Sequence, residues 1–369
     1  MKKAVIVPDS FKGTLTSEEV CEIIEAVIKS RFPQCETVKL PVSDGGEGFC
    51  RCMHEICGGS FLSLETQNPF SESITADIAI LNGGTAAVEM ASAAGITLAE
   101  GRLDPCVTST YGVGLLMKQA AEAGCRKILL GLGGSCTNDG GCGAAAALGT
   151  VFLDSSGKSF IPTGGTLINI DRIIPSPLSF EVEALCDVKN PLYGENGAAY
   201  VFAPQKGADS KTVKLLDDGL RHLADKIKEC LHKDVSLIEG GGAAGGFGAG
   251  VCAFFDGRLK RGIDAVLDEA RFEDIISDAD FIFTGEGCID SQSKDGKVID
   301  GVVSRACGKP VIAFSGGIKG CPKELYQRGL TAAFAINTLP LPLSESAPKS
   351  RENLTLTAEN VMRIISFIK

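Results

Sequence analysis

The chain has 369 residues, and because single hydrophobic cores stop growing at roughly 250–300 residues, we expect two domains. With 44% hydrophobic and 22% charged residues, its composition is that of a packed globular protein. A formal net charge of −10 excludes long-range attraction to nucleic acid or to an anionic membrane, so any anionic substrate must be held by local groups.

The N-terminal residues predict a βαβ unit. Residues 4–7 are an apolar run typical of a buried strand, and residues 37–40 indicate a second strand. Between them, Ser17 is the expected N-cap of an amphipathic helix. The apolar stripe of this helix consists of Val20, Ile23, Ile24 and Val27. Units of this kind place their loops at the carboxyl ends of parallel strands, where α/β proteins bind ligands.

The middle of the chain has a different pattern, with two expected hairpins. Residues 74–81 and 85–90 flank a glycine turn, and residues 150–161 surround another turn. Between the hairpins, residues 127–132 indicate a buried strand that runs into a glycine-rich loop and an Ala-rich helix. We therefore expect a mixed sheet in this part of the chain.

From about residue 280 the βαβ pattern returns. Strands are expected over residues 281–284 and 310–314, with a helix between them that ends near Ala306. A final helix carries an apolar stripe at Val361, Ile364, Ile365 and Ile368.

These patterns predict an α/β fold with two α/β domains. A Rossmann-like parallel-sheet domain is expected from both chain ends, residues 1–67 and 270–369. Residues 68–269 are expected to form an inserted mixed-sheet domain.

The sequence indicates a soluble, cytoplasmic protein. Pro8 and Asp9 end the first apolar run too early for a signal peptide, and no apolar stretch approaches the ~20 residues of a membrane span. Fifteen cysteines are scattered without any Cys-x-x-Cys pair, which is typical of reduced thiols. A homo-oligomer is compatible with the sequence.

Glycine-rich loops at strand ends are the main candidates for anion binding. Backbone N–H groups in such loops can point at one phosphate, and a helix that starts directly afterwards adds its partial positive charge. In the loop that follows residues 127–132, Asp139 is expected either to bind a cation or to cap a helix. The phosphate-binding candidates there are Gly133, Gly134, Ser135, Thr137 and Asn138. The sequence contains no Walker loop, which excludes an ordinary P-loop NTPase.

A second glycine run lies at residues 240–250. Residues 240–245 match the dinucleotide fingerprint Gly-x-Gly-x-x-Gly, and residues 235–238 before them could be a short strand. The match is weak because seven glycines in this run make it nearly unavoidable. We expect a mobile or closely packed loop here.

Phosphoryl transfer needs charge neutralisation, a Mg²⁺ ion held by carboxylates and a carboxylate that accepts the substrate's hydroxyl proton. Suitable side chains follow the predicted strands. Lys12 lies beside Ser10 in the loop after residues 4–7, and Asp44 and Glu47 lie in the loop after residues 37–40. Asp187 follows residues 180–185, and Glu286 and Asp290 follow residues 281–284. For each acid, the alternative is a cap or a turn former.

Six strings in the sequence resemble the bacterial type-1 glycerate kinases, in that family's order and over nearly the whole chain. They are Pro8-Asp9-Ser10-Phe11-Lys12-Gly13, Asp44-Gly45-Gly46-Glu47-Gly48, residues 133–141, Cys186-Asp187-Val188-Lys189-Asn190-Pro191-Leu192, Pro204-Gln205-Lys206-Gly207-Ala208 and Gly285-Glu286-Gly287-Cys288-Ile289-Asp290. The resemblance implies transfer of the ATP γ-phosphate to D-glycerate, usually at the 2-hydroxyl in the bacterial branch. The product would be 2-phosphoglycerate, with 3-phosphoglycerate as the alternative.

Roles for individual residues are hypotheses. Asp187 is expected to accept the proton, because it follows an apolar strand and the next residues include Asn190-Pro191, which restrict the chain. Lys12 would neutralise anionic charge, and Asp44 would share in catalysis. Glu286 and Asp290 would hold Mg²⁺. Glycerate or ATP would be bound by Ser10, Gly133, Gly134, Ser135, Thr137, Asn138, Asp139 and Lys206.

Three other functions compete with a glycerate kinase. One is a kinase of a related hydroxy acid such as erythronate or tartronate, and another is a sugar-acid sensor that binds without catalysis. A hydroxy-acid dehydrogenase would need a dinucleotide loop after the first strand, and residues 8–13 are not one. ATP turnover in the presence of glycerate separates these functions.

Overall fold

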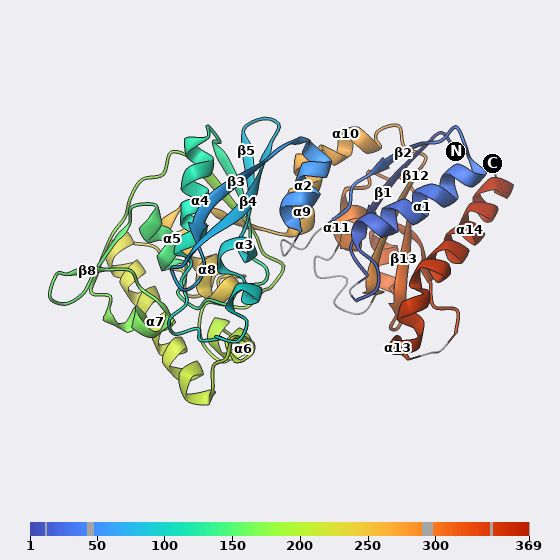
Figure 1. Ribbon diagram of the computed structural model, residues 1–369. Coiled ribbons are helices and arrows are strands. Elements are labelled where there is room, and N and C mark those ends of the chain that lie inside the picture. The colour runs from blue at the N-terminus through green and yellow to red at the C-terminus, as the bar shows by residue number, and fades with distance from the viewer. Residues whose placement is uncertain (12, 43–47, 290–297, 340–341, 369) are drawn as a thin grey trace. The chain divides into compact units, whose positions relative to one another are not determined.

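The computed structural model describes residues 1–11, 13–42, 48–289, 298–339 and 342–368 (Figure 1). The chain divides into two compact units. The first combines Met1–Ser43 with Gly262–Lys369, and the second is Asp44–Arg261.

The first unit is built on a parallel sheet. Counted over the described residues, this sheet has five strands in the order β14-β13-β12-β1-β2. β1 pairs in parallel with β12 and β2, and β13 pairs in parallel with β12 and β14. The strands are β1 (Lys3–Pro8), β2 (Glu36–Lys39), β12 (Phe281–Ile289), β13 (Val311–Ile318) and β14 (Leu330–Ala335). The two chain ends thus meet in one sheet, which confirms the predicted parallel-sheet domain.

Apolar side chains are buried on both faces of this sheet. α1 (Ser17–Arg31) and α14 (Ser350–Ile368) lie side by side (Figure 1) and share a core with Ile6, Phe283 and Phe314. Side chains alternate along a strand, so Val5 and Ile282 point to the opposite face, and both are fully buried. The other helices of the unit are α9 (Gly262–Glu269), α10 (Phe272–Ile276), α11 (Val298–Arg305), α12 (Lys323–Arg328), α13 (Leu343–Ser346) and the 3₁₀ turn η4 (Ala347–Lys349). Burial on both faces explains the continuous apolar runs in the sequence.

The N-cap of α1 is Thr16, so the expectation of Ser17 was wrong. Thr16 Oγ1 accepts a hydrogen bond from Glu19 N at 3.2 Å, and Thr16 N donates to Glu19 Oε2 at 3.0 Å. This reciprocal capping box needs Glu or Gln three residues after the cap. Thr16 has Glu19 at that position, whereas Ser17 has Val20.

The second unit is built on a mixed sheet. Its six described strands are ordered β11-β10-β6-β5-β4-β3. β5, β6, β10 and β11 run parallel to one another, and β3 and β4 are antiparallel to their neighbours. The strands are β3 (Gly59–Gln67), β4 (Ser73–Leu81), β5 (Thr85–Glu89), β6 (Lys127–Gly131), β10 (Glu181–Leu185) and β11 (Arg258–Lys260). The predicted mixed sheet and its β4–β5 hairpin are confirmed.

The second predicted hairpin is also present. β7 (Val151–Leu153) pairs antiparallel with β8 (Ser159–Phe160) and with β9 (Arg172–Ile174). These strands form a small separate sheet in the same unit.

The unit boundaries differ from those that the sequence predicts. β3 pairs along its whole length with β4, from Gly59 opposite Leu81 to Gln67 opposite Ser73. A boundary at residue 67 would separate these paired strands. The observed division lies at Ser43 on one side and at Arg261 on the other, where the prediction placed residue 269.

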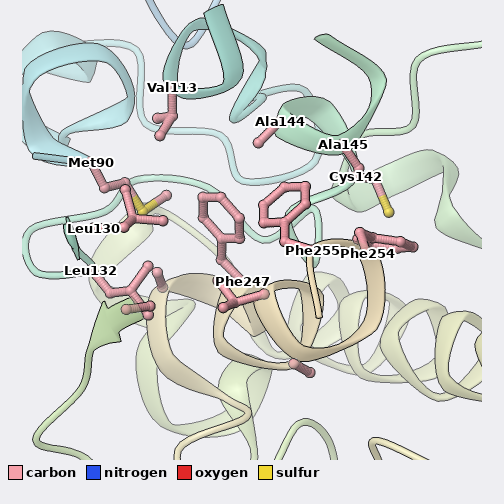
Figure 2. Close-up of a cluster of buried hydrophobic side chains, with 14 of the residues drawn as sticks. Met90, Val113, Leu130, Leu132, Cys142, Ala144, Ala145, Phe247, Phe254 and Phe255 are labelled. Atoms are coloured by element: carbon pink, nitrogen blue, oxygen red, sulfur yellow. The ribbon is translucent and has the colours of Figure 1, made fainter. Parts of the chain in front are cut away.

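The core of the second unit lies between its main sheet and several helices. In Figure 2, Val113 of α4 (Tyr111–Glu122), Leu130 of β6 and Phe247 of α8 (Ala243–Phe254) belong to one apolar cluster. Leu132, directly before the glycine-rich loop, is part of the same cluster. The remaining helical segments are α2 (Phe49–Cys57), α3 (Ala91–Ala94), η1 (Ile96–Ala99), α5 (Cys142–Ala147), η2 (Gly164–Asn169), α6 (Ala198–Phe202), η3 (Pro204–Lys206) and α7 (Ser210–Leu231). The core therefore fixes the residue from which the loop departs.

Candidate functional site

The glycine-rich loop leaves the carboxyl edge of the mixed sheet. Gly131, the last residue of β6, lies opposite Glu89 at the end of β5 and Leu185 at the end of β10. The loop that follows Gly131 and the residues that follow Leu185 therefore emerge at the same edge. This is the edge at which α/β sheets bind ligands.

Backbone hydrogen bonds attach the start of the loop to the last residue of α3 and the first residue of η1. Ile96 N donates to Gly134 O at 2.8 Å, and Cys136 N donates to Ala94 O at 3.0 Å. Gly134 has a φ of +73°, a left-handed conformation that favours glycine. The path of the loop is thus set by main-chain contacts on both sides of Ser135.

Lys206 reaches the loop from η3 and is almost fully buried, with 1% of its surface exposed. Its Nζ donates to Ser135 Oγ and to Thr137 O, both at 2.7 Å. Burial lowers the pKa of Lys206 to about 8, against the opposing influence of Cys136 and Asp139. The structure therefore brings together three of the predicted binding residues, Ser135, Thr137 and Lys206.

Asp139 anchors the end of the loop. Its carboxylate accepts hydrogen bonds from Thr110 N and Thr110 Oγ1, both at 2.8 Å. It also accepts from Gly141 N at 3.1 Å and from Gly143 N at 3.2 Å, at the start of α5. Burial raises the pKa of Asp139. Of the two roles considered for this residue, the contacts are closer to capping: the carboxylate bonds the start of α5 and joins it to Thr110 at the start of α4.

Thr110 was missed by the sequence analysis. Besides binding Asp139, its Oγ1 accepts a hydrogen bond from Ala144 N at 2.9 Å, so it ties α5 to the start of α4. Thr110 directly precedes α4, and a threonine at the start of a helix is an N-cap signal that could have identified it.

The side chains of Thr137 and Asn138 are fully buried. Thr137 Oγ1 and both polar atoms of the Asn138 amide have no hydrogen-bond partner among the residues that the structure describes. Buried polar groups are nearly always bonded, and those that are not call for an explanation such as a ligand or a bound water. Thr137 and Asn138 therefore remain candidates for contacts with a substrate.

The glycine run at 240–250 packs tightly instead of forming a dinucleotide loop. Residues 235–238 are not a strand, contrary to the expectation. Gly245 has a φ of +66°, and a β-carbon there would lie 2.0 Å from Thr137 O. Gly140 N also donates to Gly245 O at 3.1 Å. Of the two expectations for this run, a mobile or a closely packed loop, the close packing fits, and it holds α8 against the glycine-rich loop that follows β6.

Asp187 is exposed and lies two residues beyond the end of β10. The turn after it is held by Asn190, whose O accepts from Gly242 N at 2.9 Å and whose Nδ2 donates to Asn196 O at 2.8 Å. The expected rigid turn thus has a structural basis.

Two more of the predicted residues, Glu286 and Ser10, lie in the first unit. Glu286 is 3% exposed and lies opposite Ser315 in the register of β12 and β13. Ser10 follows β1, and its N donates to Asp9 Oδ1 at 2.7 Å. Lys12, Asp44 and Asp290 lie outside the described residues.

A Mg²⁺ ion usually binds through one or two protein carboxylates together with phosphate and water oxygens. Glu286 fits this donor chemistry, as a hard carboxylate in the second half of β12. Within the described ranges, no group of three or more His, Cys, Asp or Glu residues could hold a metal ion by itself. Nor do these ranges contain a helix long and apolar enough to cross a membrane.

Comparison with known proteins gives a consistent result. Residues 4–366 match the Glycerate kinase family. A glycerate kinase from Bacillus cereus is 42% identical over 371 residues, which cover 98% of this chain and 97% of the relative. A glycerate 2-kinase from Escherichia coli K12 is 40% identical over 369 residues, 97% of each chain. A crystal structure from Salmonella typhimurium LT2, described as a candidate glycerate kinase 2, superposes with a TM-score of 0.86 at 37% identity and covers 99% of this chain and 98% of that one.

Proposed function

Because the chain belongs to the glycerate kinase family, we propose that it transfers the γ-phosphate of ATP to D-glycerate. The products are ADP and 2-phosphoglycerate, with 3-phosphoglycerate as the alternative. The name of the E. coli relative, glycerate 2-kinase, supports the 2-hydroxyl.

The observation that carries this proposal is the buried contact of Lys206 with the loop of Ser135 and Thr137. A chain with a net charge of −10 has to hold ATP and glycerate, both anions, by local groups. The loop offers a buried cationic residue and polar side chains that no other described residue uses. Preorganised donors of this kind stabilise the charge that develops during phosphoryl transfer.

The remaining residues take the following roles. Asp187 accepts the proton of the glycerate hydroxyl while that oxygen forms its bond to the γ-phosphorus and ADP leaves. Lys12 neutralises negative charge, Ser10 contributes to binding, and Asp44 assists catalysis. Mg²⁺, held by Glu286 and Asp290, would neutralise phosphate charge when bound. We also place the enzyme in the cytoplasm, as expected for fifteen cysteines without a Cys-x-x-Cys pair.

Phosphorus NMR of the products from ATP, Mg²⁺ and D-glycerate tests the proposal. We expect ADP and a single phosphoglycerate whose phosphorus couples to the proton on C2. Coupling to the C3 protons would assign the 3-hydroxyl. Turnover with erythronate or tartronate but not with glycerate would identify a kinase of a related acid, and binding of glycerate without ATP consumption would identify a sensor.

A further inference from the structure

Lys206 is a buried amine without an ion pair in the described chain. Its Nζ contacts one hydroxyl and one carbonyl, from Ser135 and Thr137. Asp139 influences it electrostatically, but the Asp139 oxygens accept from Thr110, Gly141 and Gly143. Fully buried lysines are almost always paired, because an isolated buried charge is costly. This arrangement therefore points to an anionic ligand.

The direction of the Lys206–Ser135 hydrogen bond follows from chemistry. A charged lysine has three N–H donors and no acceptor, so Ser135 Oγ must accept from Nζ. The hydrogen of the Ser135 hydroxyl must then point elsewhere, and no described residue accepts it. Ser135 is 8% exposed, against 1% for Lys206, so Ser135 is the more accessible residue of the pair.

We propose that Lys206 is a positioning residue that keeps the Ser135 hydroxyl turned outward as a hydrogen-bond donor to a substrate oxyanion. The oxyanion is either the carboxylate of glycerate or a phosphate of the nucleotide. This inference rests on the proposed function for the identity of the substrates. The contact geometry itself does not depend on it.

The proposal predicts a pH dependence. As a neutral amine, Lys206 has a lone pair that accepts from Ser135, so the hydroxyl hydrogen turns inward and the donor to the substrate is lost. The pKa of Lys206 is lowered to about 8 by burial, which places this reversal in an accessible range. Two other titratable groups face the amine. Burial raises the pKa of Cys136 to about 12, so that thiol stays neutral through this range. Burial also raises the pKa of Asp139, whose carboxylate accepts hydrogen bonds from Thr110, Gly141 and Gly143.

Steady-state kinetics from pH 6.5 to 9.5 test the inference, with KM measured separately for glycerate and ATP. In the wild type, kcat/KM for one substrate should fall about tenfold per pH unit above the pKa of the lysine. Ser135→Ala should raise the KM of that substrate roughly 10- to 100-fold at pH 7, with little change in kcat, because a hydrogen bond to a charged group is lost. Its alkaline decline should be smaller than that of the wild type, because only the direct attraction between Lys206 and the substrate anion remains, whereas Ser135→Thr should keep both the affinity and the full decline.

The substrate whose KM responds identifies the oxyanion. Lys233→Gln is the matched control, because Lys233 also donates to backbone carbonyls, those of Cys252 and Ala253, in the same unit. It should leave the pH profile unchanged. Wild-type KM values for both substrates in Ser135→Ala, or an alkaline decline there as large as that of the wild type, would overturn the proposal.

A second measurement is independent of turnover. In protein with ¹³Cε-labelled lysine, the Lys206 signal is assigned by its loss in Lys206→Met or, if that variant does not fold, by its shift in Ser135→Ala. Its titration midpoint should rise by about one pH unit or more when the recognised substrate is added, because a nearby anion favours the charged amine. Absence of catalysis with this shift present would reject the kinase function alone. An unchanged midpoint with both substrates bound would reject the role of Lys206.

Discussion

Thr137 belongs to the glycine-rich loop that follows β6, and Thr108 contacts that loop. Both threonines are fully buried, but their hydroxyls differ in hydrogen bonding. Thr108 Oγ1 donates to Cys136 O at 3.1 Å, whereas Thr137 Oγ1 has no partner within the described chain. Removing an unpartnered buried hydroxyl relieves a desolvation cost of about 1–3 kcal/mol. Thr137→Val should therefore raise the free energy of unfolding in chemical denaturation. It should also lower kcat/KM by about tenfold or more if the hydroxyl contacts the substrate.

Thr108→Val provides the matched comparison. This variant loses a made hydrogen bond and leaves the Cys136 carbonyl unpaired, so it should be destabilised by about 1–3 kcal/mol. Equal destabilisation of the two variants would mean that the Thr137 hydroxyl is bonded in the folded protein.

Asp187 can be tested by its response to Mg²⁺. If it accepts the hydroxyl proton, Asp187→Asn should lower kcat by roughly 10²–10⁴-fold with an almost unchanged Mg²⁺ requirement. The measurement is a Mg²⁺ titration at saturating ATP and glycerate. Recovery of kcat at high Mg²⁺ would make Asp187 a metal ligand, and the base would then be sought at Asp44 or Asp290.

Much of the candidate loop could be predicted from its residue types, but its contacts could not. Glycines, hydroxyls and an amide after an apolar strand indicate a phosphate-binding loop. The bond between Lys206 and Ser135 joins residues 71 positions apart, and it depends on how η3 packs against the loop. The anchoring of Asp139 by Thr110 likewise joins two segments that no local pattern connects.

At the scale of elements, glycines allow α8 to approach the loop closely. Gly245→Ala would require a left-handed alanine with its β-carbon 2.0 Å from Thr137 O, the carbonyl that Lys206 also binds. The variant should lose several kcal/mol of stability, and the shifted carbonyl should disturb Lys206 and lower activity. Thermal denaturation and kcat/KM measure the two effects.

Gly157→Ala is the control for the cost of a left-handed backbone without a steric clash. Gly157 has a φ of +81° in the β7–β8 turn, and a β-carbon there would meet nothing within 4 Å. Its cost should be limited to the left-handed backbone, about 1–2 kcal/mol, with activity preserved. A similar loss in both variants would show that the contact with Thr137 is unimportant.

Helices and strands with a clear period of apolar residues could be predicted from the sequence, and those without such a period could not. The βαβ pattern at both chain ends and the glycine turn of the β4–β5 hairpin follow from local sequence. β3 was missed because its alternation is short: Leu62 and Leu64 pack against the core between exposed residues, and only Thr66 of the strand is buried. Since β3 belongs to the mixed sheet, this omission also displaced the predicted boundary to residue 67.

At the scale of the whole molecule, the central strands of the first unit come from distant parts of the sequence. β1 lies between β2 and β12, and the core of this unit combines α1 with α14, Phe283 and Phe314. The second unit is a continuous segment with its own sheet and core. These two layouts predict different behaviour when the chain is divided.

Residues 48–261 expressed alone should fold and unfold cooperatively, because their sheet and core come from one continuous segment. Residues 262–369 alone should remain unfolded, because β12 lacks its partner β1 and the face covered by α1 is exposed. Adding a peptide of residues 1–42 should restore a cooperative transition to 262–369, followed by far-UV circular dichroism during heating. The same peptide should leave the melting of 48–261 unchanged. A cooperative transition in 262–369 without the peptide would contradict this account, because it would show that β12, β13 and β14 form a stable core without the N-terminal strand.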